Sequence, residues 1–427
     1  MSDLAVLDVR LHGRRIGSLT RLGGDRTIFA FDQDYVADPA RPTLSLSFKD
    51  AFGSLITDIP PTQRRLPPFF ANLLPEGVLR DYLALRAGVH PDREFFLLRA
   101  LGQDLAGAVS IVPADPDTGQ SPAGRAEDAM GSRDPAGVLR FSLAGVQLKF
   151  SAVHRAGKNG GLAIPARGIG GEWIVKLPST RFEGVPENEF AMMSLARDLG
   201  IDVPEIRLVD LDGIDGLPQD LGQIRGQGFA IRRFDRTAAG AVHIEDFAQI
   251  FGVYPEKKYK SASLRNILQV LATESGVEAT ADFVRRLVFS VLIGNADMHL
   301  KNWSVIYADK RTARLAPAYD MLSTIPYMPD ENFALKFTRV KRFDAFTWEE
   351  LGRMAEKAGL PLEDRAHILW AGLLHDSGAL SLKQRVDFLE FELFHPGNHA
   401  EFGCRLVEVF EPFKEAAFLI KHHHTRW

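Results

Sequence analysis

Three polar residues, Asp297, Asn302 and Asp320, are arranged along this chain in a way that few folds can satisfy. The stretch from Ala279 to Ile293 carries apolar residues at helical spacing and stops at a glycine, so it predicts a helix that ends just before Asp297. After Asn302, two apolar runs separated by a polar turn predict a β-hairpin. Because a hairpin returns the chain to its start, we expect Asp320 to lie near Asn302.

This arrangement indicates phosphoryl transfer. Asp297 and Asn302 are separated by the same interval, Asp-x-x-x-x-Asn, as the catalytic aspartate and metal-binding asparagine of protein kinases. A carboxylate can orient or deprotonate a hydroxyl, and two oxygen ligands at Asn302 and Asp320 can hold the Mg²⁺ that neutralises phosphates. Asp and Asn also cap turns, so the prediction depends on the ordered unit of helix, loop, hairpin and second acid rather than on any single residue.

A lysine on an apolar strand is the second feature. Residues 172–178 predict a short buried strand that bears Lys176, and a lysine in that setting needs an anionic partner. The following predicted helix, from about Pro186 to Gly200, carries Glu189. Protein kinases pair a strand lysine with a helix glutamate to bind nucleotide phosphates. For each residue taken alone, a snorkelling lysine and a solvated glutamate are the simpler interpretation.

A loop of small residues lies upstream. Residues 141–153 predict two strands around a loop at Ser142 to Gly145, and backbone N–H groups in such a loop can bind phosphates. The loop has neither the Gly-x-Gly-x-x-Gly nor the Walker pattern, so by itself it favours an ordinary hairpin.

Together these segments resemble, in order, six motifs of the HipA family. They are Ser142–Lys149, Ile174–Pro178, Asn188–Glu189, Arg233–Arg236, Gly294–Asn302 and Tyr319–Asp320. Members of this family are bacterial serine/threonine kinases that act as the toxin of a toxin–antitoxin pair. The resemblance spans almost the whole chain. It implies an α+β fold in which a small N-terminal α+β domain precedes a two-lobed, protein-kinase-like core.

The resemblance also implies roles for individual residues. Asp297 matches the catalytic base, and Asn302 and Asp320 match the Mg²⁺ ligands. The residues implied to bind ATP outside the loop are Lys176, which contacts phosphates, its partner Glu189, and Arg232 and Phe234 in the segment that contacts adenine.

The flexible phosphate-binding loop of the family matches residues 142–147. Its positions here are Ser142, Leu143, Ala144, Gly145, Val146 and Gln147. In the family the loop serine is autophosphorylated in trans, which expels the loop and inactivates the kinase. Ser142 occupies that position.

Composition and local patterns predict four segments. Residues 1–112 are expected to form the small N-terminal domain and 113–137, rich in Pro, Gly, Asp and Ser, a linker. Residues 138–234 are expected to form a strand-rich lobe and 235–427 a helical lobe, with nucleotide between the lobes. The histidine-rich end of the chain is interpreted as a frayed terminus.

The whole-chain composition favours a cytoplasmic enzyme. Of 427 residues, 45% are hydrophobic and 25% charged, which is typical of a globular protein. A single cysteine excludes an intramolecular disulfide framework, and we find neither a signal-peptide core nor an apolar run that could span a membrane. The net charge of −4 argues against a chain that binds nucleic acid by itself.

The partners are those that the resemblance implies. The N-terminal domain is expected to bind a helix-turn-helix antitoxin similar to HipB. The chain would then contact DNA only through that antitoxin. The expected substrate is a protein of the translation machinery, such as an aminoacyl-tRNA synthetase. Two alternatives stay open: a kinase-shaped subunit that sequesters an antitoxin with little chemistry, and a kinase that acts on a small molecule or lipid head group.

Overall fold

A computed structural model describes residues 5–114, 149–154, 162–164, 170–179, 181–217, 226–328 and 332–360 of the chain. It combines helices and sheets in an α+β fold. Two compact units are distinguished. The first consists of the residues up to Ser194 together with Asp202–Ala262 and His299–Leu322, and the second of Leu195–Ile201, Ser263–Met298 and the residues from Ser323 onwards.

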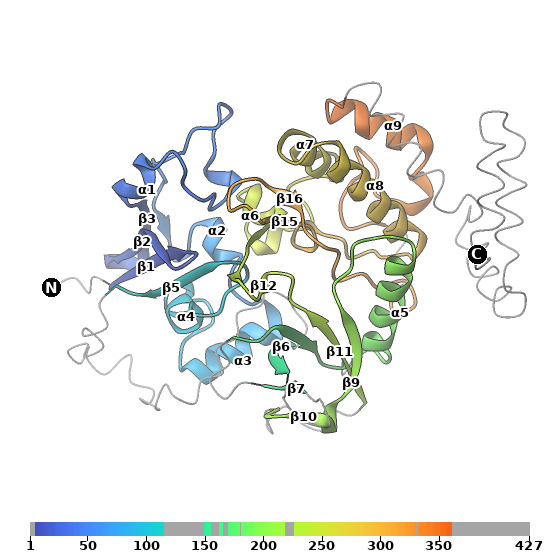
Figure 1. Ribbon diagram of the computed structural model, residues 1–427, viewed down its shortest axis with the longest axis horizontal. Coiled ribbons are helices and arrows are strands. Elements are labelled where there is room, and N and C mark those ends of the chain that lie inside the picture. The colour runs from blue at the N-terminus through green and yellow to red at the C-terminus, as the bar shows by residue number, and fades with distance from the viewer. Residues whose placement is uncertain are drawn as a thin grey trace, which may run out of the picture. The chain divides into compact units, whose positions relative to one another are not determined.

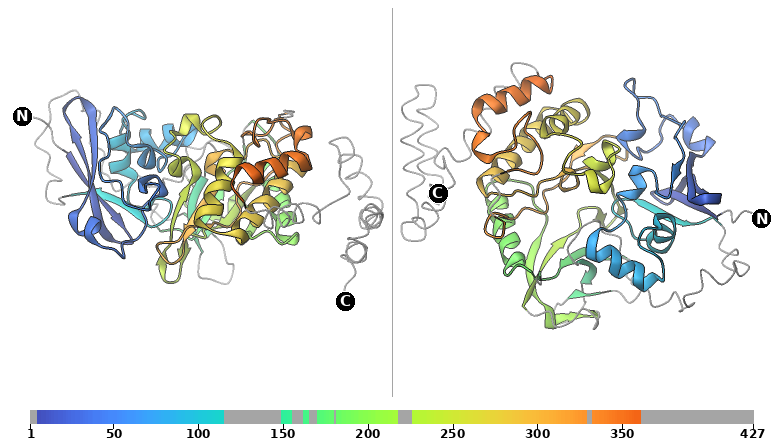
Figure 2. Two further views of the ribbon diagram at one scale, coloured as in Figure 1. Left: turned by 90° about the horizontal axis from the view of Figure 1, so that it is seen from above. Right: turned by 180° about the vertical axis from the view of Figure 1, so that it is seen from behind.

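The first unit begins with a five-stranded antiparallel sheet in the order β4-β3-β2-β1-β5 (Figure 1). Its strands are β1 (Ala5–Leu11), β2 (Arg14–Leu22), β3 (Arg26–Phe31), β4 (Thr62–Gln63) and β5 (Val109–Pro113). On β1, Leu7, Val9 and Leu11 alternate with other residues and are buried, as expected for a strand with one face in the core. Figure 2 shows the blue strands of this sheet from two further directions.

Four helices accompany this sheet: α1 (Gln33–Ala37), α2 (Pro68–Ala71), α3 (Gly77–Ala87) and α4 (Glu94–Leu101). The amino-acid pattern from Pro68 to Ala87 favours a single helix, but the chain leaves the helix between α2 and α3. The side chain of Asn72 donates to the Pro68 carbonyl at 2.9 Å. Pro75 has no N–H with which to continue the helix, and it disfavours a helical conformation in the residue before it.

A second sheet of the first unit has the strand order β10-β7-β6-β8-β11-β9. The strands are β6 (Lys149–His154), β7 (Leu162–Ala163), β8 (Trp173–Lys176), β9 (Ile206–Asp210), β10 (Ile214–Asp215) and β11 (Gln227–Arg232). One hydrophobic core contains Val9 and Ile111 of the first sheet together with Phe150 and Val175 of the second. The first hundred residues therefore share their core with the strands that carry the predicted nucleotide site.

The first unit also contains two small sheets and a short helix. The strands are β12 (Arg236–Thr237) and β13 (Gly240–Ala241) in one, and β14 (His243–Asp246), β15 (Ser304–Tyr307) and β16 (Arg314–Leu315) in the other. β15 and β16 are antiparallel neighbours, which confirms the hairpin predicted after Asn302. Asp246 caps α6 (Phe247–Ile250), and α6 packs against α2.

The described helices of the second unit are α7 (Leu264–Glu274), α8 (Val277–Leu292) and α9 (Trp348–Lys357), and it includes the last turn of α5 (Val185–Asp198). α8 confirms the helix predicted before Asp297. It ends because Gly294 has a left-handed backbone, with φ of 65°, and a Cβ there would lie 2.5 Å from the Ile325 side chain. Within the part of the chain that the structure describes, no helix is long and apolar enough to cross a membrane.

Candidate active site

Lys176 is the centre of the site. It ends β8, between β6 and β11, and only 7% of the residue is exposed. Its ammonium donates to Glu189 Oε1 at 2.5 Å and also to Asp320 Oδ1. Burial alone would lower the pKa of Lys176, but the two carboxylates outweigh burial and raise it above its ordinary value. The lysine is therefore charged. The structure joins it to Glu189, its predicted partner, and also to Asp320, which was predicted only as a metal ligand.

Glu189 reaches Lys176 from α5. Met193 and Ala196 of the same helix are buried on the side that carries Glu189. Burial raises the pKa of Glu189 to about 7, although Lys176 acts in the opposite direction. The glutamate thus depends on its lysine to remain ionised at neutral pH.

Asp320 follows the returning hairpin strand and has a left-handed backbone, with φ of 54°. Such a conformation is uncommon outside glycine and occurs often at functional sites. The preceding residues are fixed by hydrogen bonds: Ala318 N–H donates to Asp202 O at 2.7 Å, and Tyr319 OH donates to Lys301 O at 2.9 Å. Burial would raise the pKa of Asp320, but Lys176 and Lys149 lower it to about 2. The side chain is an anion.

Lys149 adds a second cation that sequence reasoning did not assign to the site. It pairs directly with Lys176 across β6 and β8, and opposite residues of an antiparallel pair share a face of the sheet. Burial lowers the pKa of Lys149 to about 8, while Asp320 acts to raise it. Side chains along a strand point alternately to its two faces, so both lysines fall on one face of the sheet once the register of β6 and β8 is known.

Asn302 is buried at the end of a single 3₁₀ turn, Leu300–Asn302, which leads into β15. A hydrogen bond to a distant segment stabilises the turn, because Leu300 N–H donates to Lys258 O at 3.3 Å. Beside it, burial lowers the pKa of His299 to about 3, so its imidazole is neutral. Asn302 and Asp320 belong to the same unit as Lys176.

Phe234 lies just after β11, half-buried, with its ring 5.8 Å from the ring of Tyr319. Its two neighbours form a buried ionic network: Arg233 donates to Asp235 at 2.8 and 2.9 Å and to Asp104 at 3.3 Å. Arg232 is different, since its guanidinium is exposed and lies 3.9 Å from Glu172 and 3.6 Å from Glu205, whose side chains are both exposed too.

Asp297 belongs to the second unit. Its backbone N–H donates to Asn295 Oδ1 at 3.1 Å, and the N–H of Ala296 donates to Thr324 Oγ1 at 2.7 Å. These bonds fix the loop that follows α8. The predicted phosphate loop, Ser142 to Gln147, lies outside the described residues.

The donor set fits Mg²⁺ of the kind that accompanies ATP. Among the residues described, no cluster of three or more His, Cys, Asp or Glu side chains is placed to hold a metal by itself. Mg²⁺ in kinase sites is instead bound through one or two protein oxygens, with substrate phosphates and water completing the shell. Asn302 and the ionised Asp320 have oxygen atoms of the kind that such a site uses.

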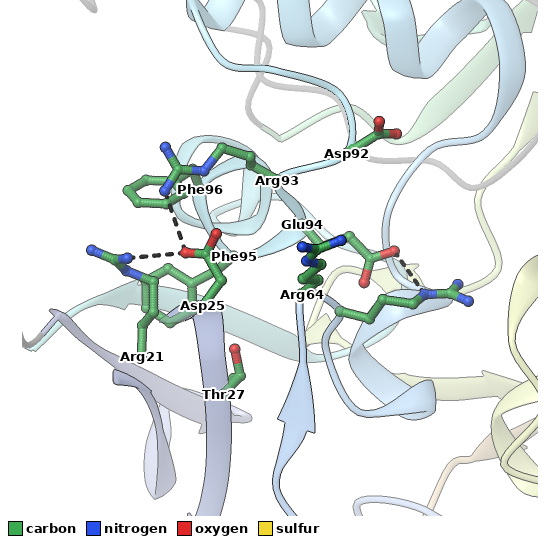
Figure 3. Close-up of a pocket in the computed structure, with 10 residues that line it drawn as sticks. Arg21, Asp25, Thr27, Arg64, Asp92, Arg93, Glu94, Phe95 and Phe96 are labelled. Carbon is green, nitrogen blue, oxygen red and sulfur yellow. Dashed lines mark hydrogen bonds and ion pairs between the residues drawn. The ribbon is translucent and has the colours of Figure 1, made fainter. Parts of the chain in front are cut away.

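A separate cavity of about 250 Å³ lies on the first hundred residues (Figure 3). Five of its charged side chains form pairs with one another: Asp25 accepts from Arg21 at 3.0 Å and from Arg93 at 3.3 Å, and Arg65 lies 3.6 Å from Glu94. None of the predicted site residues lines it.

Two family models match the chain, and one of them covers the candidate site. Residues 7–112 match the family model of the HipA N-terminal domain, and residues 141–372 match that of the HipA-like C-terminal domain. The chain is 58% identical over 361 residues, 84% of this chain and 87% of the other, to a Sinorhizobium fredii protein named "Putative kinase Y4dM". It is 29% identical to the serine/threonine-protein kinase toxin HipA of Shewanella oneidensis, over 77% of each chain.

The fold is also that of a solved structure. The chain matches HipA in the complex of Shewanella oneidensis HipA, HipB and operator DNA with a TM-score of 0.65. The match has 23% identity and covers 98% of this chain and 97% of that chain.

A third family model was not anticipated from the sequence. Residues 347–427 match the HD domain, overlapping the end of the preceding match. The available signals were the adjacent His375 and Asp376 and the run His422 to His424, residue types that bind metals. All of these lie outside the described residues.

Proposed function

Because this chain belongs to the HipA family of kinases, we propose that it is an ATP-dependent serine/threonine protein kinase. One observation carries the proposal: buried Lys176 is held between Glu189 and Asp320. A lysine fixed by a helix glutamate and placed beside a metal-binding aspartate is the arrangement that protein kinases use to position nucleotide phosphates.

Charge supports the choice of a nucleotide. Lys149 and Lys176 present two ammonium groups on one face of the second sheet, a suitable surface for phosphate oxygens. We assign the adenine end to Phe234 and Arg232, and the remaining phosphate contacts to the loop from Ser142 to Gln147.

The transfer step follows from the roles proposed for the acidic residues. Asp297 accepts the proton of a serine or threonine hydroxyl as its oxygen bonds to the γ-phosphorus, while the bond from that phosphorus to the β,γ-bridging oxygen breaks and ADP leaves. Asn302 and Asp320 would hold Mg²⁺, which when bound neutralises charge on the phosphates. Lys176 orients the same phosphates and stays protonated throughout.

The substrate and partners are proposed from the family. The acceptor is a protein of the translation machinery, such as an aminoacyl-tRNA synthetase, in the cytoplasm. A helix-turn-helix antitoxin binds the first hundred residues, and DNA is met through it. The Shewanella oneidensis relative supports this pairing, since its structure is that of a complex of HipA, HipB and operator DNA.

Ser142 is the proposed site of autophosphorylation. A phosphate adds nearly two negative charges to a loop that must hold the phosphates of ATP, so repulsion should expel the loop and stop transfer. Mass spectrometry after incubation with ATP should place phosphate on Ser142, and Ser142→Ala should remove that signal. Phosphate found only on Ser151 would refute this assignment and leave the kinase assignment intact.

Incubation with γ-labelled ATP and Mg²⁺, alone and with cell lysate, tests the main proposal. We expect label on the chain itself and on a lysate protein, and none of either after chelation of Mg²⁺. A chain that binds an antitoxin but transfers no label would instead be a sequestering subunit, and label found only in the small-molecule or lipid fraction would identify a different acceptor.

A further inference from the structure

Lys301, the residue before Asn302, is buried and bound to the first hundred residues of the chain. Its ammonium donates to Asn72 O at 2.8 Å, to Asn72 Oδ1 at 3.1 Å and to Asp246 Oδ2 at 3.0 Å. Glu76 Oε1 lies 3.8 Å away. A lysine ammonium has three donors, and here all three are used by residues distant in sequence.

Asn72 is itself fixed on both sides of its amide. Its Nδ2 donates to Val253 O at 2.7 Å and to Pro68 O at 2.9 Å, while its Oδ1 accepts from Lys301. Only 2% of the residue is exposed. It occupies the break between α2 and α3, where the backbone carbonyl that would otherwise continue a helix is available to Lys301. The break in the helix therefore provides an acceptor for the buried ammonium of Lys301.

The backbone of Lys301 connects this anchor to the second metal ligand. Its carbonyl accepts from Tyr319 OH, and Tyr319 directly precedes Asp320. A single residue thus joins Asn72, the backbone next to Asn302 and the segment that carries Asp320. All of these residues belong to the first unit.

We propose that Asn72 is a positioning residue for the metal ligands, acting through Lys301. The inference deepens the proposed function, because it concerns the same Mg²⁺ pair. If the Asn72 side chain is removed, a buried ammonium loses an acceptor and Val253 O and Pro68 O lose a donor, so the turn that carries Asn302 shifts to restore its hydrogen bonds. Loss of such an outer-shell partner typically lowers metal affinity by about 10- to 100-fold.

The test is calorimetric titration of the full-length protein with ATP, with Mg²⁺ present and with EDTA. For the wild type we expect Mg²⁺ to increase ATP affinity. In Asn72→Ala this metal-dependent gain should fall by about tenfold or more, while affinity in EDTA stays unchanged because Lys176 and Lys149 are untouched. Lys301→Met should lower the gain in the same way, and the double variant should be no worse than either single variant.

Two further variants separate positioning from general stability. Asn72→Asp keeps an oxygen for Lys301 and should retain more of the gain than Asn72→Ala. Glu256→Ala removes a surface ion pair with Arg65, at 2.6 Å, between the same parts of the chain and should leave the gain at its wild-type value. If Asn72→Ala does not fold, Asn72→Asp and Lys301→Met carry the comparison.

An unchanged metal-dependent gain in folded Asn72→Ala or Lys301→Met would overturn the inference. So would a wild type that shows no such gain. A wild type that shows the gain, loses it in these variants, and yet transfers no phosphate would remove the kinase assignment while upholding the positioning role of Asn72.

Discussion

Lys149 and Lys176 lie directly opposite each other on neighbouring antiparallel strands. Like charges in this position destabilise a sheet unless anions offset them, and Glu189 and Asp320 provide that offset. A sheet that keeps two facing lysines at the end of buried strands is suited to binding a polyanion.

Lys176→Ala should weaken ATP binding about 10- to 100-fold, the effect of losing one charge-assisted contact to phosphate. Calorimetry with ATP and Mg²⁺ measures it. Lys257→Ala, which removes an exposed lysine elsewhere on the same unit, is the matched control and should bind ATP as the wild type does. Equal affinity in both variants would reduce Lys176 to a structural role.

ATP affinity should fall as pH rises above about 8. Burial gives Lys149 a pKa of about 8, so it is charged below that pH and neutral above it. Bound phosphates favour the charged form and raise this pKa, so affinity declines by up to about tenfold per pH unit between the free and bound pKa values. Titrations at pH 7 and 9 measure the change. Lys149→Arg stays charged and should show a flatter profile; an identical slope would assign the effect to another group.

Asp297→Asn and Asp320→Ala should both stop phosphate transfer but differ in ATP binding. Loss of a positioned base costs on the order of 10² to 10⁴ in rate and leaves ATP bound as before. Loss of Asp320 removes a metal ligand and also an acceptor of Lys176, so the gain from Mg²⁺ should disappear. Labelled ATP and calorimetry on the same preparations distinguish the two. Near-wild-type transfer by Asp297→Asn would show that the base is another group.

Stability should depend on pH through Glu245. This carboxylate is buried and accepts from Ser45 Oγ, Leu46 N–H and Tyr307 OH, at 2.5, 2.9 and 2.5 Å. Burial raises its pKa to about 7, so the folded state holds the proton more tightly than the unfolded state. The resulting stabilisation is present below about pH 4.5 and is lost as pH rises towards 7, by at most about 1.4 kcal/mol per pH unit.

Urea unfolding at pH 5 and pH 8 measures this dependence. Glu245→Gln has nearly the same shape and no ionisable group, so its free energy of unfolding should change less between the two pH values than that of the wild type. A matching pH dependence in the variant would exclude Glu245 as the source.

The elements around the site were predictable because their signals are local. The helix α7 (Leu264–Glu274) has such signals, since Ser263 caps its start with Asn266 and its apolar residues repeat at helical spacing. Lys176 and Glu189 were predicted to pair because protein kinases join a strand lysine to a helix glutamate, and the structure confirms this pair. The bond from Lys176 to Asp320 was not predicted.

What the sequence did not predict depends on contacts between distant residues. The register that places Lys149 opposite Lys176 is set by the pairing of β6 with β8, not by either strand alone. Residues 68–87 have the composition of one helix, and Pro75 alone does not reveal that Asn72 bonds to Lys301. Partners separated by 229 positions have no local signature.

Phe234 stands between Arg233 and Asp235, whose side chains bond to the segment around Asp104 and Gly107. Breaking a buried ion pair by removing one partner costs about 3–5 kcal/mol, and here the two sides also share a hydrophobic core. The first hundred residues are therefore not an independently moving domain on a flexible linker. A partner that binds them, as proposed above, would contact the same unit that carries Phe234, so it would act by covering the site or by deforming this backbone rather than by pulling a domain away.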